Sequence, residues 1–273
     1  MAPDRADADA VVAGRAAVLF AGHSTVRLDI DGTRIVTDPL LRRSLGPLVR
    51  HGTRPDAVDL SGADAVLVSH GHPDHFDGRS LRALEGVGVV IVPRGLGQAA
   101  GRHTDARVVE LVAGETVDVA GLRVSAVEAR HWIMPGAPRA APVGYLVEGS
   151  VRAWFAGDTG RFPAMAALRG RVDLALLPVW TWGPHLGPGH LGPRAAAEVL
   201  ATVGAGAAVP IHWATLYPRR LHHVLRAPLD EPGDRFARHA AEACPDADVR
   251  VLRPGEATVF DLARSTWTAV RGC

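Results

Sequence analysis

The sequence predicts an α/β protein with mixed β-sheets, and three observations support this. Short apolar runs typical of strands recur through the first half of the chain, whereas strands and helices alternate in the second half. Of the 273 residues, 47% are hydrophobic and 22% are charged, as in globular proteins. No stretch with the composition of a linker divides the chain. We therefore expect residues 1–15 to form a flexible N-terminus and residues 16–273 to form a single domain.

The first half of the chain is predicted to consist mainly of β-strands. Asp31-Gly32 is a hairpin signal between two apolar runs. The segment Asp77–Ser80 predicts the capped start of a helix that continues through Leu84. Strands are expected over residues 16–20, 26–30, 33–37, 65–69, 87–92, 108–111, 122–129, 144–147 and 151–155.

The second half of the chain alternates between strands and helices. An apolar strand over residues 174–179 precedes a loop rich in glycine, proline and tryptophan, which extends from Trp180 to Pro193. Residues 194–203 have the composition of a helix. Further strands are expected over residues 207–211, 249–251 and 257–260.

The charge and cysteine content exclude several classes of function. The net charge is +1, which argues against a large surface for nucleic acid. All 30 basic residues are arginine, so catalysis by lysine is excluded. The two cysteines, Cys244 and Cys273, are too few for a disulfide framework or a cysteine-rich metal site.

The sequence shows no targeting or membrane segment. Residues 1–14 lack the basic stretch and apolar core of a signal peptide. The longest apolar runs, such as Val87–Val92, are far shorter than the roughly 18 residues of a membrane-spanning helix. We therefore expect a cytoplasmic protein that acts on a small molecule, without nucleic acid or a membrane segment, and with an oligomeric state that the sequence does not indicate.

The strongest chemical signal is the pattern His-x-His-x-Asp-His over residues 70–75, directly after a strand-like run. His70 and His72 are two residues apart, so in extended chain both imidazoles face the same side. The glycine and the proline inside the motif shape a rigid loop. Asp74 and His75 are placed to reach a second ion beside the first. Three imidazoles and a carboxylate within six residues favour a metal site over a polar loop with incidental histidines.

This motif resembles the signature of the metallo-β-lactamase superfamily, whose dinuclear hydrolases carry three more ligands downstream, each after a strand. His131, Asp158 and His212 each follow an apolar run, in the order of that family. The resemblance implies a four-layer αβ/βα sandwich, in which two mixed sheets are flanked by helices. It also implies two metal ions, the first held by His70, His72 and His131, the second by Asp74, His75 and His212, with Asp158 bridging them.

Shorter motifs resemble the branch of this superfamily that holds N-acyl-phosphatidylethanolamine phospholipase D and ascorbate-6-phosphate lactonase. They are GHSTV at 22–26, TDP at 37–39, RHW at 130–132, GDTG at 157–160, GHLGP at 189–193 and PIHW at 210–213. The resemblance covers the chain from about His23 to the turn at Pro254–Glu256. The chain departs from the branch after His190, where Arg194 replaces an acidic helix start.

Several residues beside these ligands have roles that the sequence leaves open. The resemblance implies that His190 donates a proton to the leaving group or binds a substrate oxyanion, rather than serving only as a structural loop residue. His23 and Asp38 are interpreted as residues that orient ligands. The side chains that either line a pocket or serve the core or surface are Trp132, Trp180, Trp182, Trp213 and His185.

These features together predict a dinuclear metal-dependent hydrolase that acts on ester bonds. In this hypothesis a metal-bridging hydroxide attacks a phosphodiester or other phosphate-containing ester, with Asp74 and His190 as catalytic residues. The nitrogen and oxygen ligands suit two zinc ions, our first expectation, and also manganese or iron. The alternatives are a lactone or carboxylic ester hydrolase using the same site, an iron-dependent redox enzyme and a non-catalytic metal-binding protein.

Overall fold

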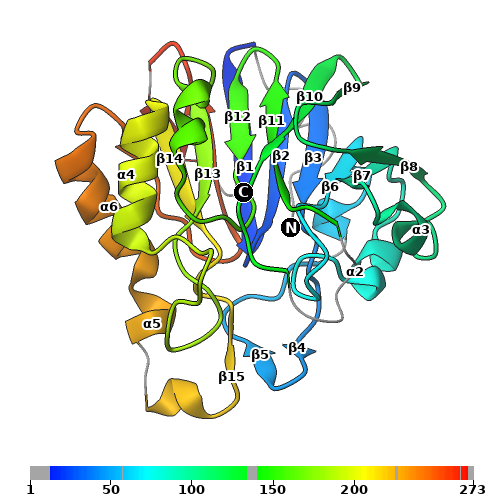
Figure 1. Cartoon of the computed structure of the whole chain (residues 1–273), viewed down its shortest axis with the longest axis horizontal. Helices are drawn as coiled ribbons and strands as arrows, with labels where there is room; N and C mark the ends of the chain where they lie inside the picture. The colour runs from blue at the N-terminus through cyan, green and yellow to red at the C-terminus, as the bar shows by residue number, and fades with distance from the viewer. Residues whose placement is uncertain (1–12, 57, 134–139, 225–226, 265, 270–273) are drawn as a thin grey trace.

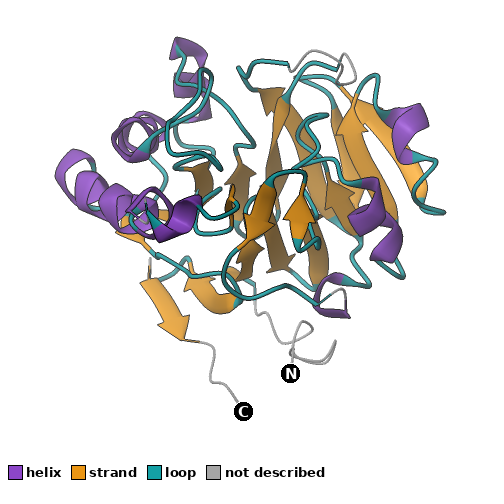
Figure 2. Ribbon diagram, turned by 90° about the horizontal axis from the view of Figure 1, so that it is seen from below, coloured by secondary structure: helices purple, strands orange, loops and turns teal. Residues whose placement is uncertain are grey.

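The computed structural model describes residues 13–56, 58–133, 140–224, 227–264 and 266–269. Strands form two mixed sheets that face each other across an apolar core, and helices cover the outer face of each sheet (Figure 1, Figure 2). The α/β class and the αβ/βα sandwich predicted from the sequence are therefore confirmed. Most of the predicted flexible N-terminus, residues 1–12, lies outside the described residues.

The first sheet carries the histidine motif after the carboxyl end of one of its interior strands. In spatial order its strands are β18 (Thr266–Ala269), β17 (Glu256–Asp261), β1 (Arg15–Gly22), β2 (Thr25–Ile30), β3 (Thr33–Thr37), β6 (Ala65–Leu67), β7 (Val89–Pro93) and β8 (Arg107–Leu111). Strands β3, β6, β7 and β8 run parallel, and β1 is antiparallel to both β17 and β2. In β6, Ala65 and Leu67 face the second sheet, whereas Val66 packs toward the helices. Burial on both faces explains why this strand is a continuous apolar run.

The second sheet supplies the remaining predicted ligands. In spatial order its strands are β16 (Asp248–Val249), β14 (Ala207–Ile211), β13 (Leu174–Pro178), β12 (Arg152–Phe155), β11 (Val143–Glu148), β10 (Leu122–Glu128) and β9 (Thr116–Val119). Strands β12, β13, β14 and β16 run parallel, while β9 to β12 form an antiparallel meander. Tyr145 and Trp154 are buried in the core that this sheet shares with the first.

Helices close the two outer faces of the sandwich. The first sheet is covered by α2 (Gly78–Ala83) and α3 (Gly97–Ala100), and the second by α4 (Pro193–Val203) and α6 (Pro232–Ala243). The predicted helix start is confirmed, because the Asp77 carboxylate accepts the backbone N–H of Ser80 at 3.1 Å. Helix α4 ends at Gly204, whose φ of 69° is the left-handed conformation that glycine favours at this position. The remaining helical turns are η1 (Val58–Leu60), η2 (Pro163–Leu168), η3 (Leu221–His223) and α5 (Ala227–Asp230).

A small additional sheet, which the sequence did not predict, lies below the main sheets in Figure 1. It consists of β4 (Ser44–Leu45), β5 (Leu48–Arg50) and β15 (Leu216–Pro218). Strand β5 pairs antiparallel with both neighbours, so this sheet joins two segments that are far apart in the sequence.

Strand direction brings the predicted site residues to one end of the sandwich. In the first sheet β1, β3 and β6 point the same way, and in the second sheet β10, β12, β13 and β14 do so. Each predicted ligand follows the carboxyl end of one of these strands. The loops that leave those strand ends therefore meet where the two sheets open.

Replacing Asp77 by alanine should lower the free energy of unfolding by about 0.5–2 kcal/mol, because the Ser80 N–H loses its acceptor at the start of α2. Chemical denaturation measures this loss. Asp77→Ser keeps an acceptor at the cap and should retain most of the stability. Equal losses in both variants would show that the cap is not what Asp77 contributes.

Candidate metal centre

The histidine motif forms a tight loop directly after β6. The backbone N–H groups of His75 and Phe76 both donate to the carbonyl of His72, at 3.0 and 2.8 Å, so the chain turns sharply at Pro73. The same loop then enters α2 through its Asp77 cap. Its short turn holds three imidazoles and a carboxylate against the open end of the sheets.

His70, His72 and His131 form the first group of ligating atoms. These atoms lie within 4.8 Å of one another, and Nδ1 of His72 is 3.1 Å from Nε2 of His131. Nδ1 of His70 contacts the Ser69 hydroxyl at 2.9 Å, and Nδ1 of His131 contacts the Gly189 carbonyl at 3.0 Å. A ring nitrogen held in this way fixes the imidazole and leaves the other nitrogen facing a metal ion.

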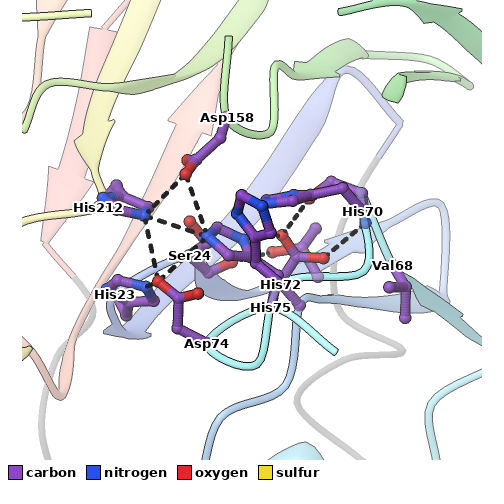
Figure 3. A network of polar contacts seen from close by, with 12 residues as sticks. His23, Ser24, Val68, His70, His72, Asp74, His75, Asp158 and His212 are labelled. Carbon is purple, nitrogen blue, oxygen red and sulfur yellow. Dashed lines mark hydrogen bonds and ion pairs between the residues drawn. The ribbon is translucent and has the colours of Figure 1, made fainter. Parts of the chain in front are cut away.

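Asp74, His75 and His212 form the second group, and His23 joins them (Figure 3). Nε2 of His75 lies 3.1 Å from Nε2 of His212 and 3.6 Å from Oδ2 of Asp74. Nε2 of His23 is 2.9 Å from the same Asp74 oxygen. Nδ1 of His75, the other nitrogen of this ring, lies 2.7 Å from Oδ2 of Asp38. His23 thus reaches the second group, although the sequence only suggested that it orients a ligand.

Asp158 lies between the two groups (Figure 3). Its Oδ2 is 3.2 Å from Nε2 of both His75 and His212, and 4.0 Å from Nε2 of His131. His190 approaches the same oxygen, with its Nε2 at 3.4 Å. The carboxylate therefore contacts imidazoles of both groups and also the loop that carries His190.

Site residues hold an uncommon backbone conformation. The φ angles of His23, Asp38 and His212 are 58°, 32° and 61°, in the region that favours glycine. Such residues cost on the order of 1–3 kcal/mol each and persist only where surrounding contacts hold them. Here the His212 N–H donates to the His23 carbonyl at 2.7 Å, and the His23 N–H donates to the Thr215 hydroxyl at 2.6 Å.

The electrostatic balance of the site centres on His75. Its burial lowers the pKa, but the carboxylates of Asp158, Asp74 and Asp38 outweigh this and hold the pKa well above its usual value. Burial acts in the same sense on His131 but there outweighs the Asp158 carboxylate, and the pKa of His131 falls to about 4. Without a metal ion, the protonated His75 ring therefore lies among buried carboxylates that are shielded from solvent.

The residues present fit divalent metal ions. Nε2 of His70 and Oδ1 of Asp158 are buried and have no hydrogen-bond partner among the described residues, a costly arrangement that bound cations would relieve. Imidazole nitrogens and carboxylate oxygens are a donor set that suits zinc, manganese and iron. The division into two ion sites remains our proposal, and it matches the grouping that the resemblance implied.

The structure shows which of the tryptophans with an undecided role are buried and which are exposed. Trp213 is buried in the core, beneath the guanidinium of Arg253. Trp132 and Trp182 are 53% and 37% exposed, and the Trp132 ring lies 6.3 Å from that of His72. His185 is exposed on the same loop as Trp182. Trp213 is therefore structural, whereas Trp132 stands beside the first group of ligands.

Sequence reasoning missed two hydroxyl residues that support the site. The Ser69 hydroxyl links the Asp38 carboxylate, at 2.6 Å, to His70. Thr215 holds the strained backbone at His23. The position of Ser69 immediately before the motif was an available signal, whereas nothing in the sequence connects Thr215 with a residue almost 200 positions earlier.

The fold and the paired clusters define a metal-dependent hydrolase of the metallo-β-lactamase type. Residues 33–213 match the family model described as beta-lactamase superfamily domain. The chain is 32% identical to a UPF0173 metal-dependent hydrolase of Methanopyrus kandleri, covering 88% of this chain and 97% of the relative. It is 33% identical to a UPF0173 hydrolase of Thermus thermophilus, with 89% and 99% covered. The chain thus belongs to the UPF0173 metal-dependent hydrolases of the β-lactamase superfamily.

Solved structures share the fold. Igni18, a metallo hydrolase from Ignicoccus hospitalis, is 20% identical with a TM-score of 0.68, covering 90% of this chain and 98% of its own. CmlA, a diiron β-hydroxylase from Streptomyces venezuelae, is 21% identical with a TM-score of 0.66, covering 90% and 54%. The predicted superfamily is confirmed, while the resemblance to the phospholipase and lactonase branch stays a prediction. No helix in the described part of the chain is long and apolar enough to cross a membrane.

Replacing Asp158 by alanine should remove at least one of two bound ions per chain, because the carboxylate between the groups is lost. Elemental analysis of protein loaded with zinc or manganese measures the ratio, and circular dichroism checks that the fold is retained. Asp118→Ala, on the exposed edge strand β9, serves as the control and should keep both ions. Full metal content in Asp158→Ala would contradict the bridging role.

Metal binding should release protons at neutral pH, because His75 is protonated in the metal-free protein and must lose that proton to bind a cation. The affinity should therefore increase as the pH rises toward the raised pKa of His75. Calorimetry in buffers of different ionisation enthalpy measures the number of protons released. A heat of binding that does not depend on the buffer would contradict this charge balance.

Proposed function

We propose that this metal-dependent hydrolase cleaves a phosphodiester or another phosphate-containing ester. The observation that carries the proposal is the meeting of two groups of ligating atoms at Asp158, with unpartnered buried atoms turned into the cluster. Paired divalent cations are a common device for displacement at phosphorus. Zinc is the first ion to test, followed by manganese and iron.

His70, His72 and His131 would hold one ion, and Asp74, His75 and His212 the other, with Asp158 shared between them. When bound, two such ions lower the pKa of a water molecule and polarise the bond that is broken. The protein's own contribution is a buried and prearranged donor set, in which hydrogen bonds at Nδ1 fix the orientation of the His70, His75 and His131 rings.

Asp74 is proposed to orient the attacking water and to accept its proton. The side chain is buried, and the His23 ring holds one of its oxygens at 2.9 Å. Burial lowers the pKa of His23 to about 3, so the ring is neutral and donates a hydrogen bond to the carboxylate. This contact fixes the rotation of Asp74 and favours its ionised form.

His190 is proposed to protonate the leaving group. Its Nδ1 contacts the Gly187 carbonyl at 3.2 Å, which turns Nε2 toward Asp158 at 3.4 Å. Burial opposes protonation, but the Asp158 carboxylate outweighs it and raises the pKa of His190. A protonated imidazole at this position would supply the proton that an alkoxide leaving group needs.

Exposed apolar side chains lie on the two loops that carry His131 and His190. The large exposed ones include Trp132 and Ile133 on the loop after β10, and Trp182 and Leu186 on the loop after β13. Contact between the His131 ring and the Gly189 carbonyl joins these two loops. Exposed apolar surface beside a polar site indicates that part of the substrate is apolar.

This exposed apolar surface also favours a second candidate function, the hydrolysis of a lactone or carboxylic ester. Arg130 stands on the same loop as Trp132, but its charge is paired with Glu128 at 2.8 Å and its guanidinium lies over the Phe162 ring. That arginine is therefore engaged elsewhere and does not favour a phosphate group over a carboxylic ester.

Hydrolysis of bis-aryl phosphodiesters and of lactones by the metal-loaded protein decides between the two functions. We expect turnover of phosphodiesters that chelation abolishes and added metal restores. Turnover of lactones alone would establish the second candidate. Absence of hydrolysis on both classes by protein with full metal content would overturn the proposed function.

His190→Ala should lower kcat by about 10²–10⁴-fold on esters with a poor leaving group, because general acid catalysis is lost. Metal content should stay intact, and esters with a good leaving group should be affected far less. Elemental analysis beside the kinetics separates the outcomes. Loss of metal would make His190 a ligand, and an unchanged rate on the poor leaving group would remove it from the mechanism.

A further inference from the structure

Positive charge gathers around the small additional sheet. Residues 39–55 and 213–224 contain no aspartate or glutamate, although the whole chain has 29 such residues and a net charge of only +1. Pairing of β5 with β15 brings the two segments together, and the Arg219 N–H donates to the Pro47 carbonyl at 3.0 Å. The arginines on these segments are Arg42, Arg43, Arg50, Arg54, Arg219 and Arg220.

A cleft of about 350 Å³ lies between this basic region and α2. Arg42 and Arg54 line it from one side, and Arg79 lines it from the helix. Asp56 supplies the only carboxylate among the described residues of its wall. The volume is at the lower end of the range for small-molecule sites, roughly 300–1,000 Å³.

The arginines of this cleft are not fully neutralised by their surroundings. Nε of Arg54 donates to the Leu41 carbonyl at 3.1 Å, which is a neutral acceptor. Nη1 of Arg42 is 3.5 Å from Asp77, whose carboxylate already caps α2. The Arg79 side chain is exposed, and in the described part of the chain it has no ion pair. The cleft therefore has more positive charge than its wall compensates.

A fourth arginine, Arg50, does not line the cleft but holds the backbone of one of its walls. Arg50 donates from Nε to the Arg42 carbonyl at 3.0 Å and from Nη2 to the Leu40 carbonyl, both uncharged acceptors. Its Nη1 is buried and lacks a hydrogen-bond partner in the described structure. Burial, together with the charge of Arg54, lowers the pKa of Arg50 to about 10.

We propose that this cleft is a second ligand site, which binds a small anion bearing a phosphate or pyrophosphate group. Guanidinium groups pair with phosphate oxygens through two parallel hydrogen bonds, and several guanidinium groups around one cleft match a multiply charged anion. The walls are already joined, since the Leu41 N–H donates to the Ser80 hydroxyl at 2.8 Å. The backbone of one wall is therefore tied to the helix that forms the other.

The cleft is distinct from the metal centre but adjoins it along the chain. None of its lining residues is among the proposed metal ligands. Leu41, the first residue of one wall, follows Asp38 by three positions in the sequence. Arg79, the first residue of the other wall, follows His75 by four positions. Binding here does not depend on the proposed hydrolysis, so each can fail without the other.

Calorimetric titration of the metal-loaded protein with sodium pyrophosphate tests the proposal. The double variant Arg54→Ala/Arg79→Ala should weaken binding at least tenfold. Arg43→Ala/Arg219→Ala removes the same charge from exposed positions of the same region outside the cleft, and should change the affinity less than threefold. Thermal unfolding checks that both variants fold, and Arg79→Ala alone, at an exposed position, should still weaken binding measurably if the double variant does not fold.

Pyrophosphate can also bind metal ions, so the titration is repeated on Asp158→Ala. Persistent binding in that variant, together with loss in the cleft variant, supports the proposal. Equal losses in the two arginine double variants would show diffuse attraction instead of a site. Loss of binding in Asp158→Ala with no change in the cleft variant would place the anion at the metal centre, and absence of binding by the unmodified protein would also overturn the proposal.

Discussion

One fully buried carboxylate, Asp38, connects the fold with the metal centre. Its Oδ1 accepts the Ser69 N–H at 2.7 Å, and its Oδ2 accepts the Ser69 hydroxyl and contacts Nδ1 of His75. Its own N–H donates to the Leu67 carbonyl, which ties β3 to the end of β6. A buried carboxylate is tolerated only when such partners replace water. The strand ends and the orientation of the motif are therefore determined by the same group, and neither can shift without exposing an unpaired charge.

The sequence predicted the parts of the structure that depend on local pattern. Strands β3 and β14 were predicted with the bounds that the structure has, because the hairpin signal Asp31-Gly32 marks the start of β3 and the apolar run of β14 lies between Gly206 and His212. The helix start at Asp77 was predicted from cap chemistry that operates within four residues. The metal-binding motif was also predicted from a short stretch of sequence, residues 70–75. Its three distant partners came from a resemblance to a family, since spacing alone does not show which strands become neighbours.

The parts that the sequence did not predict depend on contacts between distant segments. Strands β5 and β15 are short, and they exist because segments 166 or more residues apart pair with each other, as Leu48 does with Pro218. Helix α6 is polar on average, and its apolar face at Phe236 and Ala240 was too sparse to stand out. In β2, Arg27 and Asp29 are buried where alternation would place them in solvent, because they pair with each other at 2.9 Å beneath a covering loop.

The position of β1 has a consequence for biosynthesis. This strand lies inside its sheet, and its partner β17 pairs Arg15 with Asp261 across most of the chain. During translation one edge of β1 has no partner until β17, residues 256–261, has been synthesised. An unpaired strand edge can pair with another nascent chain. The β1–β2 hairpin that carries His23 can pair locally, so the edge of β1 that later receives β17 is the one left open to other chains in the meantime.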